Sequence, residues 1–307
     1  MSSLNKISMF IRNPILNLSK TLLVNSPTIP YSKLKFSGGE EHIKITNCNI
    51  ISESEKITIA TSLTSSSDVM SMLLATNAIR SINSEVKIDL FAPYIPYARQ
   101  DRIMSGGEAL GIKVMANLIN SQSYDKVHVF DPHSSVTHAL INNVNLIDYR
   151  SFCFSAFVKI RSNNCFSNGE NYCIVSPDAG AEKKIYNIAK YFNSKSRIPL
   201  IDSEKIILGS KQRDVLTGEI TQTRAMGNVR DKICIIFDDI IDGGATFINL
   251  AIALRRRGAK KVYLVASHGI FSKGIDVFRP IIDNIYITNS INCINDDYVT
   301  TENILYN

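Results

Sequence analysis

Short apolar runs alternate with helix-like patterns along most of this chain. Eight segments with buried or alternating apolar residues are typical of strands: 42–45, 56–60, 86–90, 126–130, 172–175, 206–213, 232–237 and 260–268. Between them, apolar residues recur at helical spacing, as in Val69, Met72, Leu73 and Ile79, in Ile185, Ile188, Ala189 and Phe192, and in Phe247, Leu250, Ala251 and Leu254. Strands that alternate with helices predict an α/β fold with mainly parallel sheets and helices on both faces.

The remaining segments carry weaker patterns. Residues 1–35 offer one candidate strand near 21–24, and Ser66 and Asp68 are candidate caps for the helix that follows. The polar stretch 149–170 predicts a domain boundary, and the segment 260–268 is expected to close the second sheet. The second half repeats the strand–turn–helix order of the first without a residue-level repeat. The sequence therefore predicts two domains, 1–148 and 149–307.

Length and composition narrow the class of protein. With 307 residues, 45% of them hydrophobic, the chain can build two ordinary cores. It has no run of about 18 apolar residues and no signal-peptide core, so no membrane span is expected. Its six cysteines lack a CxxC pair, which predicts reduced thiols in a cytoplasmic protein. The net charge of +6 is dispersed, which favours small polyanions over nucleic acid.

Residues 232–246 carry the strongest chemical signal. An apolar strand ends in the acids Asp238 and Asp239, and Asp242 leads into the turn made by Gly243, Gly244, Ala245 and Thr246. A glycine turn that opens a helix presents backbone N–H groups to an anion, and carboxylates beside it suit sugar hydroxyls or a cation. The pattern is neither a P-loop nor a GxGxxG fingerprint. A plain structural strand-to-helix turn is the alternative.

Three further strand ends carry polar groups. The proline- and tyrosine-rich loop 93–102 presents Arg99, Gln100, Asp101 and Arg102, of which the arginines suit phosphate or a purine. Asp131 and His133 follow one strand and Asp178 follows another, where each could meet a metal ion or a phosphate. For the loop the alternative is a solvated surface segment, and for the histidine it is simple packing.

Lys211 and Arg213 alternate at the end of the strand 206–213 and therefore point to one side. Two cations beside a polar segment that extends to Arg224 could reach over a triphosphate. A solvated, charged hairpin is the alternative reading of the same residues.

The segment 238–246 resembles the phosphoribosyl-pyrophosphate motif of type I phosphoribosyltransferases. Together with the loop 93–102, Asp131-x-His133, the segment 175–180 and Lys211-x-Arg213, it resembles the ribose-phosphate diphosphokinase family over residues 36–297. The resemblance implies two similar phosphoribosyltransferase-type domains. It also implies transfer of the β,γ-diphosphate of ATP, with Mg²⁺, to the anomeric hydroxyl of ribose-5-phosphate, with release of AMP.

The resemblance implies a role for each matching position. It assigns catalysis to Lys211 and Arg213, and metal binding to His133, Asp178 and Asp131. It places ATP at Phe36, Gly38, Gly39, Glu40, Arg99, Gln100, Asp101 and Arg102. It places the ribose phosphate at Asp238, Asp239, Asp242, Gly243, Gly244, Ala245 and Thr246. The family also implies homo-oligomers, either dimers or hexamers.

Four positions depart from the family pattern. Gly38 and Asn142 stand where acids are expected, Gly243 replaces a threonine, and Ala245 replaces a glycine that would adopt left-handed geometry easily. Because two of these changes lie in the sugar-phosphate loop, an alternative acceptor is a 5′-extended ribose such as ADP-ribose. A second alternative is a non-catalytic protein that regulates an active synthetase, although retention of Lys211 and Arg213 argues against it.

Overall fold

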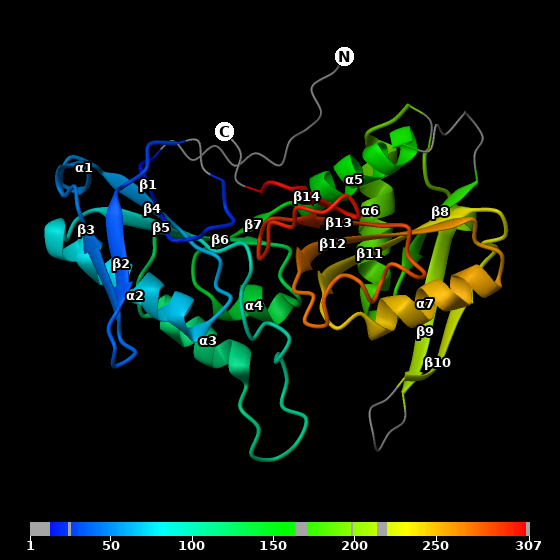
Figure 1. The fold of residues 1–307 in the computed structure, drawn as a ribbon, viewed down its shortest axis with the longest axis horizontal. Coiled ribbons are helices and arrows are strands. Elements are labelled where there is room, and N and C mark those ends of the chain that lie inside the picture. The colour runs from blue at the N-terminus through cyan, green and yellow to red at the C-terminus, as the bar shows by residue number, and fades with distance from the viewer. Residues whose placement is uncertain (1–12, 24–25, 164–170, 198, 214–219, 305–307) are drawn as a thin grey trace. The chain divides into compact units, whose positions relative to one another are not determined.

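The computed structural model describes residues 13–23, 26–163, 171–197, 199–213 and 220–304 (Figure 1). They form two compact units. The N-terminal unit comprises residues 13–148, Asn289–Ile291 and residues 303–304, and the C-terminal unit comprises Tyr149–Thr288 and Asn292–Glu302. The segment 289–291, far along the chain, thus belongs with the first unit: the buried amide of Asn289 donates to the carbonyl oxygen of Thr21 at 3.0 Å and accepts from the backbone N–H of Ile304 at 2.8 Å.

A parallel five-stranded sheet forms the centre of the N-terminal unit. In spatial order its strands are β1 (Ile15–Asn17), β4 (Lys56–Ala60), β5 (Lys87–Phe91), β6 (Lys126–Phe130) and β7 (Val144–Ile147). The interior strands β4, β5 and β6 are almost wholly buried, which explains why they read as near-continuous apolar runs.

The helices of this unit are α1 (Asn49–Ser52), α2 (Ser66–Ile82), α3 (Gly111–Asn120) and α4 (Ser135–Leu140). One stripe of α2 and one of α3 pack on the same apolar core as the strands, which confirms the helical spacing predicted for α2. The N-cap of α2 is Ser65, whose hydroxyl accepts the backbone N–H of Asp68 at 3.2 Å; the predicted cap at Ser66 was wrong by one residue.

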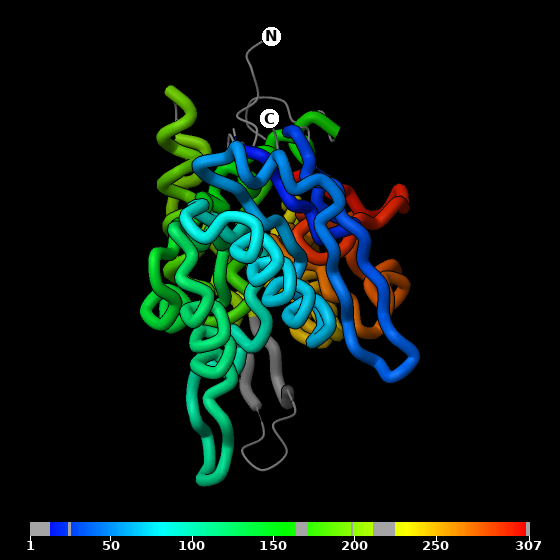
Figure 2. Tube along the Cα trace, turned by 90° about the vertical axis from the view of Figure 1, so that its left-hand side faces the viewer, coloured from blue at the N-terminus to red at the C-terminus, as the bar shows by residue number. Residues whose placement is uncertain are grey.

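Two segments before β4 differ from expectation. Residues 21–22 do not form the predicted strand, because the hydroxyl of Ser19 accepts the backbone N–H groups of Thr21 and Leu22 and holds the chain in a turn. The strand expected over 42–45 is present as β3 (Glu41–Ile45), but it pairs in a separate hairpin with β2 (Tyr31–Lys35), a strand that was not expected; the hairpin packs against α2 and buries Ile43 and Ile45 in the core of the unit. Figure 2 shows this hairpin (blue) alongside α2.

A seven-stranded sheet forms the C-terminal unit. In spatial order its strands are β10 (Ile220–Met226), β9 (Ile206–Arg213), β8 (Tyr172–Ser176), β11 (Ile233–Ile241), β12 (Lys261–Gly269), β13 (Asn284–Thr288) and β14 (Val299–Glu302). Only the edge pair β9–β10 is antiparallel. The expectation that β12 closes the sheet was wrong, since β13 and β14 extend it.

The helices of this unit are α5 (Tyr149–Asn163), α6 (Glu182–Ser194) and α7 (Ala245–Arg256), with the short 3-10 turns η1 (Ala179–Ala181) and η2 (Ser203–Lys205). The first part of the polar stretch 149–170 forms α5, which buries Phe152, Phe157 and Ile160. The ring of Phe157 lies 4.9 Å from that of Phe192 on α6. These aromatic contacts hold α5 to α6 inside the unit.

The cysteines within the described residues are free thiols, as expected. Cys173 on β8 and Cys234 on β11 face each other across the ladder with their sulfur atoms 3.5 Å apart. A shared hydrogen bond, burial and the neighbouring thiol all raise the pKa of Cys173. The two thiols therefore stay protonated and unreactive, and they serve as packing in the core. Within the described ranges, no helix is both long and apolar enough to cross a bilayer.

Candidate active site

The order of strands in the C-terminal sheet creates a topological switch point at its carboxyl edge. β8 and β11 are neighbours, but β8 leads to β9 on one side while β11 leads through α7 to β12 on the other. The connections therefore diverge between β8 and β11, and such a switch point is where open α/β sheets bind ligands. Asp178 follows β8, and Asp238 and Asp239 lie in the last part of β11. The topology thus brings three predicted site residues to one edge.

Asp178 begins the turn that leads into α6. Its backbone is extended, its Oδ1 accepts the N–H of Ala181 at 3.2 Å, and its carbonyl oxygen accepts the hydroxyl of Ser176 at 2.7 Å. Capping in this way holds the carboxylate at the end of the strand.

Asp238 and Asp239 form a closely spaced acid pair. The N–H of Asp239 donates to Oδ1 of Asp238 at 2.9 Å. Desolvation, followed by the charge of Asp239 and the hydrogen bond between the two side chains, raises the pKa of Asp238 well above its usual range. A carboxyl pair in this state can share a proton until a ligand or cation offsets its charge.

A lysine that sequence reasoning missed lies near this pair. Lys184 lies in the first turn of α6, and its positive charge lowers the pKa of Asp238. This partly offsets the rise that desolvation and Asp239 cause. The ammonium group of Lys184 also lies 4.6 Å from the ring centroid of Tyr149, a cation–π contact that orients it. No motif marks Lys184; only its place in a helix beside the switch point could have suggested it.

The turn after β11 fits the predicted anion cradle and corrects one expectation. Gly244 is the N-cap of α7 and has φ +82°, so it is the residue that needs the left-handed conformation. A Cβ built there would lie 2.5 Å from the ring of Phe278. Ala245 is the first residue of α7, and its substitution for glycine requires no unusual backbone angle. The expectation that alanine at position 245 would hinder a left-handed backbone conformation there was therefore wrong.

In the N-terminal unit, the loop 93–102 and the residues after β6 lie beside each other. The ladder continues past the end of β5: Ala92 donates its N–H to the carbonyl oxygen of His128 at 3.1 Å, and Phe130 donates its N–H to that of Pro93 at 3.0 Å. Tyr97 and the buried Asp131 both have positive φ, at 63° and 43°. Left-handed non-glycine residues cost energy and tend to occur where function requires them.

Asp101 joins the two strand ends electrostatically. Burial would raise the pKa of Asp101, but hydrogen bonds from Arg102 and Ser134 and the charges of Arg102 and His133 lower it overall. The charge of His133 therefore acts on the carboxylate of the neighbouring loop. This places two of the predicted ATP-site residues and one predicted metal ligand in one group.

Gln100 has a structural contact of its own. A Cβ built on Gly111 would lie 2.2 Å from Oε1 of Gln100, so the side chain of Gln100 lies across the first residue of α3. The backbone also closes here, since Gln100 donates its N–H to Tyr97 at 2.9 Å. Arg99 is exposed on the same loop.

The hairpin turn between β2 and β3 contains Phe36, Gly38, Gly39 and Glu40. Gly39 has φ +96° and donates its N–H to Phe36 at 2.8 Å, and Phe36 is 50% exposed with its ring 5.7 Å from that of His42. No atom lies within 4 Å of a Cβ built on the exposed Gly38, so no neighbouring side chain occupies the place of the expected acid.

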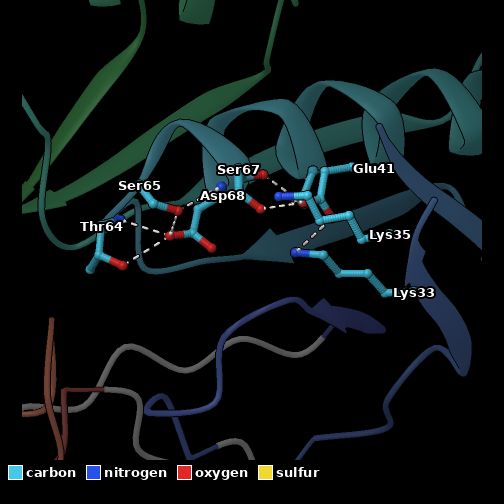
Figure 3. A network of polar contacts seen from close by, with 8 residues as sticks. Lys33, Lys35, Glu41, Thr64, Ser65, Ser67 and Asp68 are labelled. Atoms are coloured by element: carbon cyan, nitrogen blue, oxygen red, sulfur yellow. Dashed lines mark hydrogen bonds and ion pairs between the residues drawn. The ribbon is translucent and has the colours of Figure 1, made fainter. Parts of the chain in front are cut away.

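Polar contacts fix this hairpin to the start of α2 (Figure 3). The carboxylate of Glu41 accepts the hydroxyl of Ser67 at 2.6 Å and lies 3.6 Å from the ammonium of Lys33. The Ser67 hydrogen bond is the largest influence on Glu41 and lowers the pKa of its carboxyl. Sequence reasoning missed Glu41 and Ser67, because their spacing of 26 residues has no periodic signal.

Lys211 and Arg213 lie in β9, but their side chains are outside the described residues. The polar segment that follows them is not all loop, since Ile220–Met226 forms β10, antiparallel to β9. Just after α7, Arg257 donates to the carbonyl oxygens of Ala225 and Gly227, the latter at 2.6 Å, and so fixes the far end of β10.

Within the described residues, no cluster of three or more His, Cys, Asp or Glu side chains could hold a metal by protein ligands alone. This arrangement still fits a hard cation that takes one or two carboxylates and completes its shell with phosphate oxygens and water. The carboxylate of Asp131 in the N-terminal unit and that of Asp178 in the C-terminal unit each have the chemistry for that role.

Comparisons with known proteins agree with this geometry. Residues 14–122 match the N-terminal domain of ribose phosphate pyrophosphokinase, and residues 192–299 match the phosphoribosyl synthetase-associated domain. The ribose-phosphate pyrophosphokinase of Mycoplasmopsis pulmonis is 30% identical over 237 residues, which cover 76% of this chain and 68% of that protein. This chain belongs to the ribose-phosphate pyrophosphokinase family.

Other members of the family extend the match. The ribose-phosphate pyrophosphokinase of Maricaulis maris is 29% identical over 85% of this chain and 78% of its own length. The crystal structure of phosphoribosylpyrophosphate synthetase from Mycobacterium smegmatis covers 95% of both chains with a TM-score of 0.77 at 19% identity. That likeness shows the fold: two phosphoribosyltransferase-type α/β domains, as expected.

Proposed function

We propose that this family member transfers the β,γ-diphosphate of ATP to the anomeric hydroxyl of ribose-5-phosphate, giving phosphoribosyl pyrophosphate and AMP. The observation that carries this proposal is the switch point between β8 and β11, where Asp178, Asp238 and the α7 turn share one edge. A phosphate ester at the α7 turn would meet backbone N–H groups and the positive end of a helix dipole. The names of the family relatives support the same reaction.

Each group has a task in this reaction. Gly243 to Thr246 hold the 5′-phosphate, while Asp238 and Asp242 accept hydrogen bonds from the ribose hydroxyls. Lys211 and Arg213, at the end of β9, neutralise the charge that develops on the transferring diphosphate. Transfer of this kind depends on positioning and charge compensation more than on covalent catalysis.

The N-terminal unit receives ATP in this proposal. The exposed ring of Phe36 stacks on the base, and Arg99 and Arg102 contact phosphate oxygens. Mg²⁺ is the cation that best suits Asp131 and His133 in this unit and, taken separately, Asp178 in the C-terminal unit, because it is held by few protein ligands together with substrate phosphates. When bound, it neutralises the diphosphate.

A second acceptor, a 5′-extended ribose such as ADP-ribose, is favoured by the acceptor loop itself. Gly243 carries no side chain, and Ala245 is exposed at the first position of α7. A loop that lacks a threonine hydroxyl has lost a donor to a terminal phosphate, whereas a diester continues past that point.

The test is release of AMP from ATP and Mg²⁺ with ribose-5-phosphate and, separately, with ADP-ribose. Faster turnover with ribose-5-phosphate supports the first acceptor, and turnover with ADP-ribose alone supports the second. Lys211→Ala should lower the rate at least ~100-fold, as expected for loss of a charge that stabilises the transition state, whereas Lys190→Ala, on the exposed face of α6, should not. A chain that binds both acceptors but releases no AMP would contradict the proposal.

A further inference from the structure

A second loop lies directly beside the altered position of the acceptor site. A Cβ built on Gly243 would lie 3.6 Å from Cε of Lys273 and 3.7 Å from Oγ of Ser272. The space that a side chain at 243 would share is thus bordered by a cation and a hydroxyl from the segment after β12. No sequence motif assigns either residue a role.

Backbone contacts fix this neighbouring segment in place. Ile270 and Phe271 both donate their N–H groups to the carbonyl oxygen of Ile241, at 2.7 and 3.3 Å, at the very end of β11. The ring of Phe271 meets that of Phe278 edge-on at 5.9 Å, and Phe278 also packs under Gly244. The two loops therefore form one packed layer, and the position of Lys273 beside Gly243 is set by the core of the unit.

The polar ends of Ser272 and Lys273 are available to a ligand. Both residues are exposed, and neither forms a hydrogen bond or an ion pair with another residue in the described part of the chain. Asp242 precedes Gly243 on the ribose side of the turn, and Asp276, three residues after Lys273, pairs with Arg279 at 2.8 Å. A lysine ammonium on a flexible stem is a point charge suited to phosphate oxygens.

We infer that Lys273, assisted by Ser272, binds the phosphate of the acceptor and takes over the contact that a residue-243 side chain would make. The inference rests on the proposed function, because it names a residue for the same acceptor site. It makes Lys273 a determinant of acceptor affinity: the phosphate at the α7 turn is met on one side by backbone N–H groups and on the other by this ammonium. The ligand is a phosphate ester on O5′ of ribose, as a terminal phosphate or as the first phosphate of a diphosphate.

The test is equilibrium binding of ribose-5-phosphate and of ADP-ribose, without ATP, to the full chain and its variants by titration calorimetry. Lys273→Met should weaken binding of the acceptor about tenfold, in the range for loss of a charge-assisted hydrogen bond, and should reduce its salt dependence. Lys273→Arg should restore most of the affinity. The matched control Lys260→Met removes an exposed lysine beyond the far end of α7 and should leave binding unchanged.

A double-variant cycle tests the link to residue 243. Gly243 does not have a positive φ, and a Cβ at this position would make only ordinary van der Waals contacts, so Gly243→Thr should fold normally. If Lys273 replaces the missing side chain, Gly243→Thr should recover part of the affinity lost in Lys273→Met. Titration of ribose without its phosphate should show no difference between wild type and Lys273→Met.

The outcomes separate the inference from the function on which it rests. Binding by Lys273→Met within twofold of wild type, for whichever acceptor the wild type binds, overturns the inference while leaving AMP release untouched. Absence of AMP release by the wild type overturns the proposed reaction, but a Lys273-dependent loss of binding would still establish the phosphate contact. Equal losses of acceptor affinity in Lys273→Met and Lys260→Met would show that the effect arises from net charge alone, and would also overturn the inference.

Discussion

The two units use the same strand–helix architecture but assemble chemistry at their sheet edges by different means. In the N-terminal sheet the strands follow one another in a single direction, β4, β5, β6 and β7, so no switch point arises among them. In the C-terminal sheet the connections diverge between β8 and β11 and make a switch point there, the kind of place where open α/β sheets bind ligands. The candidate site of one unit therefore lies at a topological switch point, whereas that of the other lies on a hairpin and on loops with strained residues.

This difference shows in the local geometry. At the C-terminal candidate site the turn before α7 relies on a glycine, Gly244, that adopts its left-handed conformation without steric cost, although Phe271 in the adjoining loop also has a positive φ, 54°. The N-terminal site places Tyr97 and the buried Asp131 in that conformation and must stabilise them by surrounding structure. Changes at the C-terminal edge should accordingly have the larger effects.

The largest effect is expected at Gly244. Gly244→Ala forces a Cβ to within 2.5 Å of the Phe278 ring at a positive φ, so it should destabilise the protein by about 2–3 kcal/mol and abolish acceptor binding. Chemical denaturation measures the first and titration calorimetry the second. Gly274→Ala is the matched control, because Gly274 has φ +76° with nothing within 4 Å of its Cβ, and so isolates backbone strain from the clash. Equal losses in the two variants would show that Phe278 is irrelevant.

The next effect concerns the acid pair. The folded protein raises the pKa of Asp238, so this carboxyl holds its proton to a higher pH in the folded state than in the unfolded one. Stability should therefore fall as pH rises from the unfolded value of about 3.9 towards the folded pKa. Asp238→Asn removes that penalty and should raise the free energy of unfolding near neutral pH by about 1 kcal/mol while it weakens acceptor binding. Melting curves at several pH values provide the measurement; a variant less stable than wild type at pH 7 would contradict this account.

A smaller effect should follow from Lys184. Because its charge lowers the pKa of Asp238, Lys184→Met should raise that pKa further and move the acidic limb of the kcat/KM profile to higher pH by roughly half a unit. Lys183→Met, one position earlier on the exposed face of α6, is the control and should leave the limb unchanged. Identical shifts in both variants would point to net charge instead of the Asp238 contact.

The smallest effect is expected in the N-terminal unit. Glu41→Gln keeps the shape of the side chain but loses the charge that meets Lys33 and the carboxylate that accepts from Ser67 (Figure 3). The hairpin turn should then be less well placed, and the KM for ATP should rise about two- to threefold, as for loss of a single exposed contact. Steady-state kinetics with the acceptor saturating provide the measurement, with Glu53→Gln, on the exposed end of α1, as control. A change in the acceptor KM instead would show that the hairpin serves the other site.

Several elements were predictable because their signal is local. Periodicity correctly placed the strands β4, β6, β8 and β11 and the helices α2, α6 and α7. Short apolar runs mark the buried strands, and apolar residues three or four apart mark the buried face of each helix. β13 and β14 were missed because they add to an existing sheet, and α5 was missed because polar residues separate its buried aromatics.

The sequence by itself determined the α/β class, the acids and glycines at strand ends, and a family resemblance that the comparisons confirm. Only the tertiary structure decided that Gly244 carries the positive φ, that Lys184 acts on Asp238, and that Lys273 lies beside Gly243. Lys184 and Asp238 are 54 positions apart in the sequence, and Gly243 and Lys273 are 30 positions apart. Periodicity reports which face of an element is buried, but strand order and loop packing decide which residues from distant segments meet.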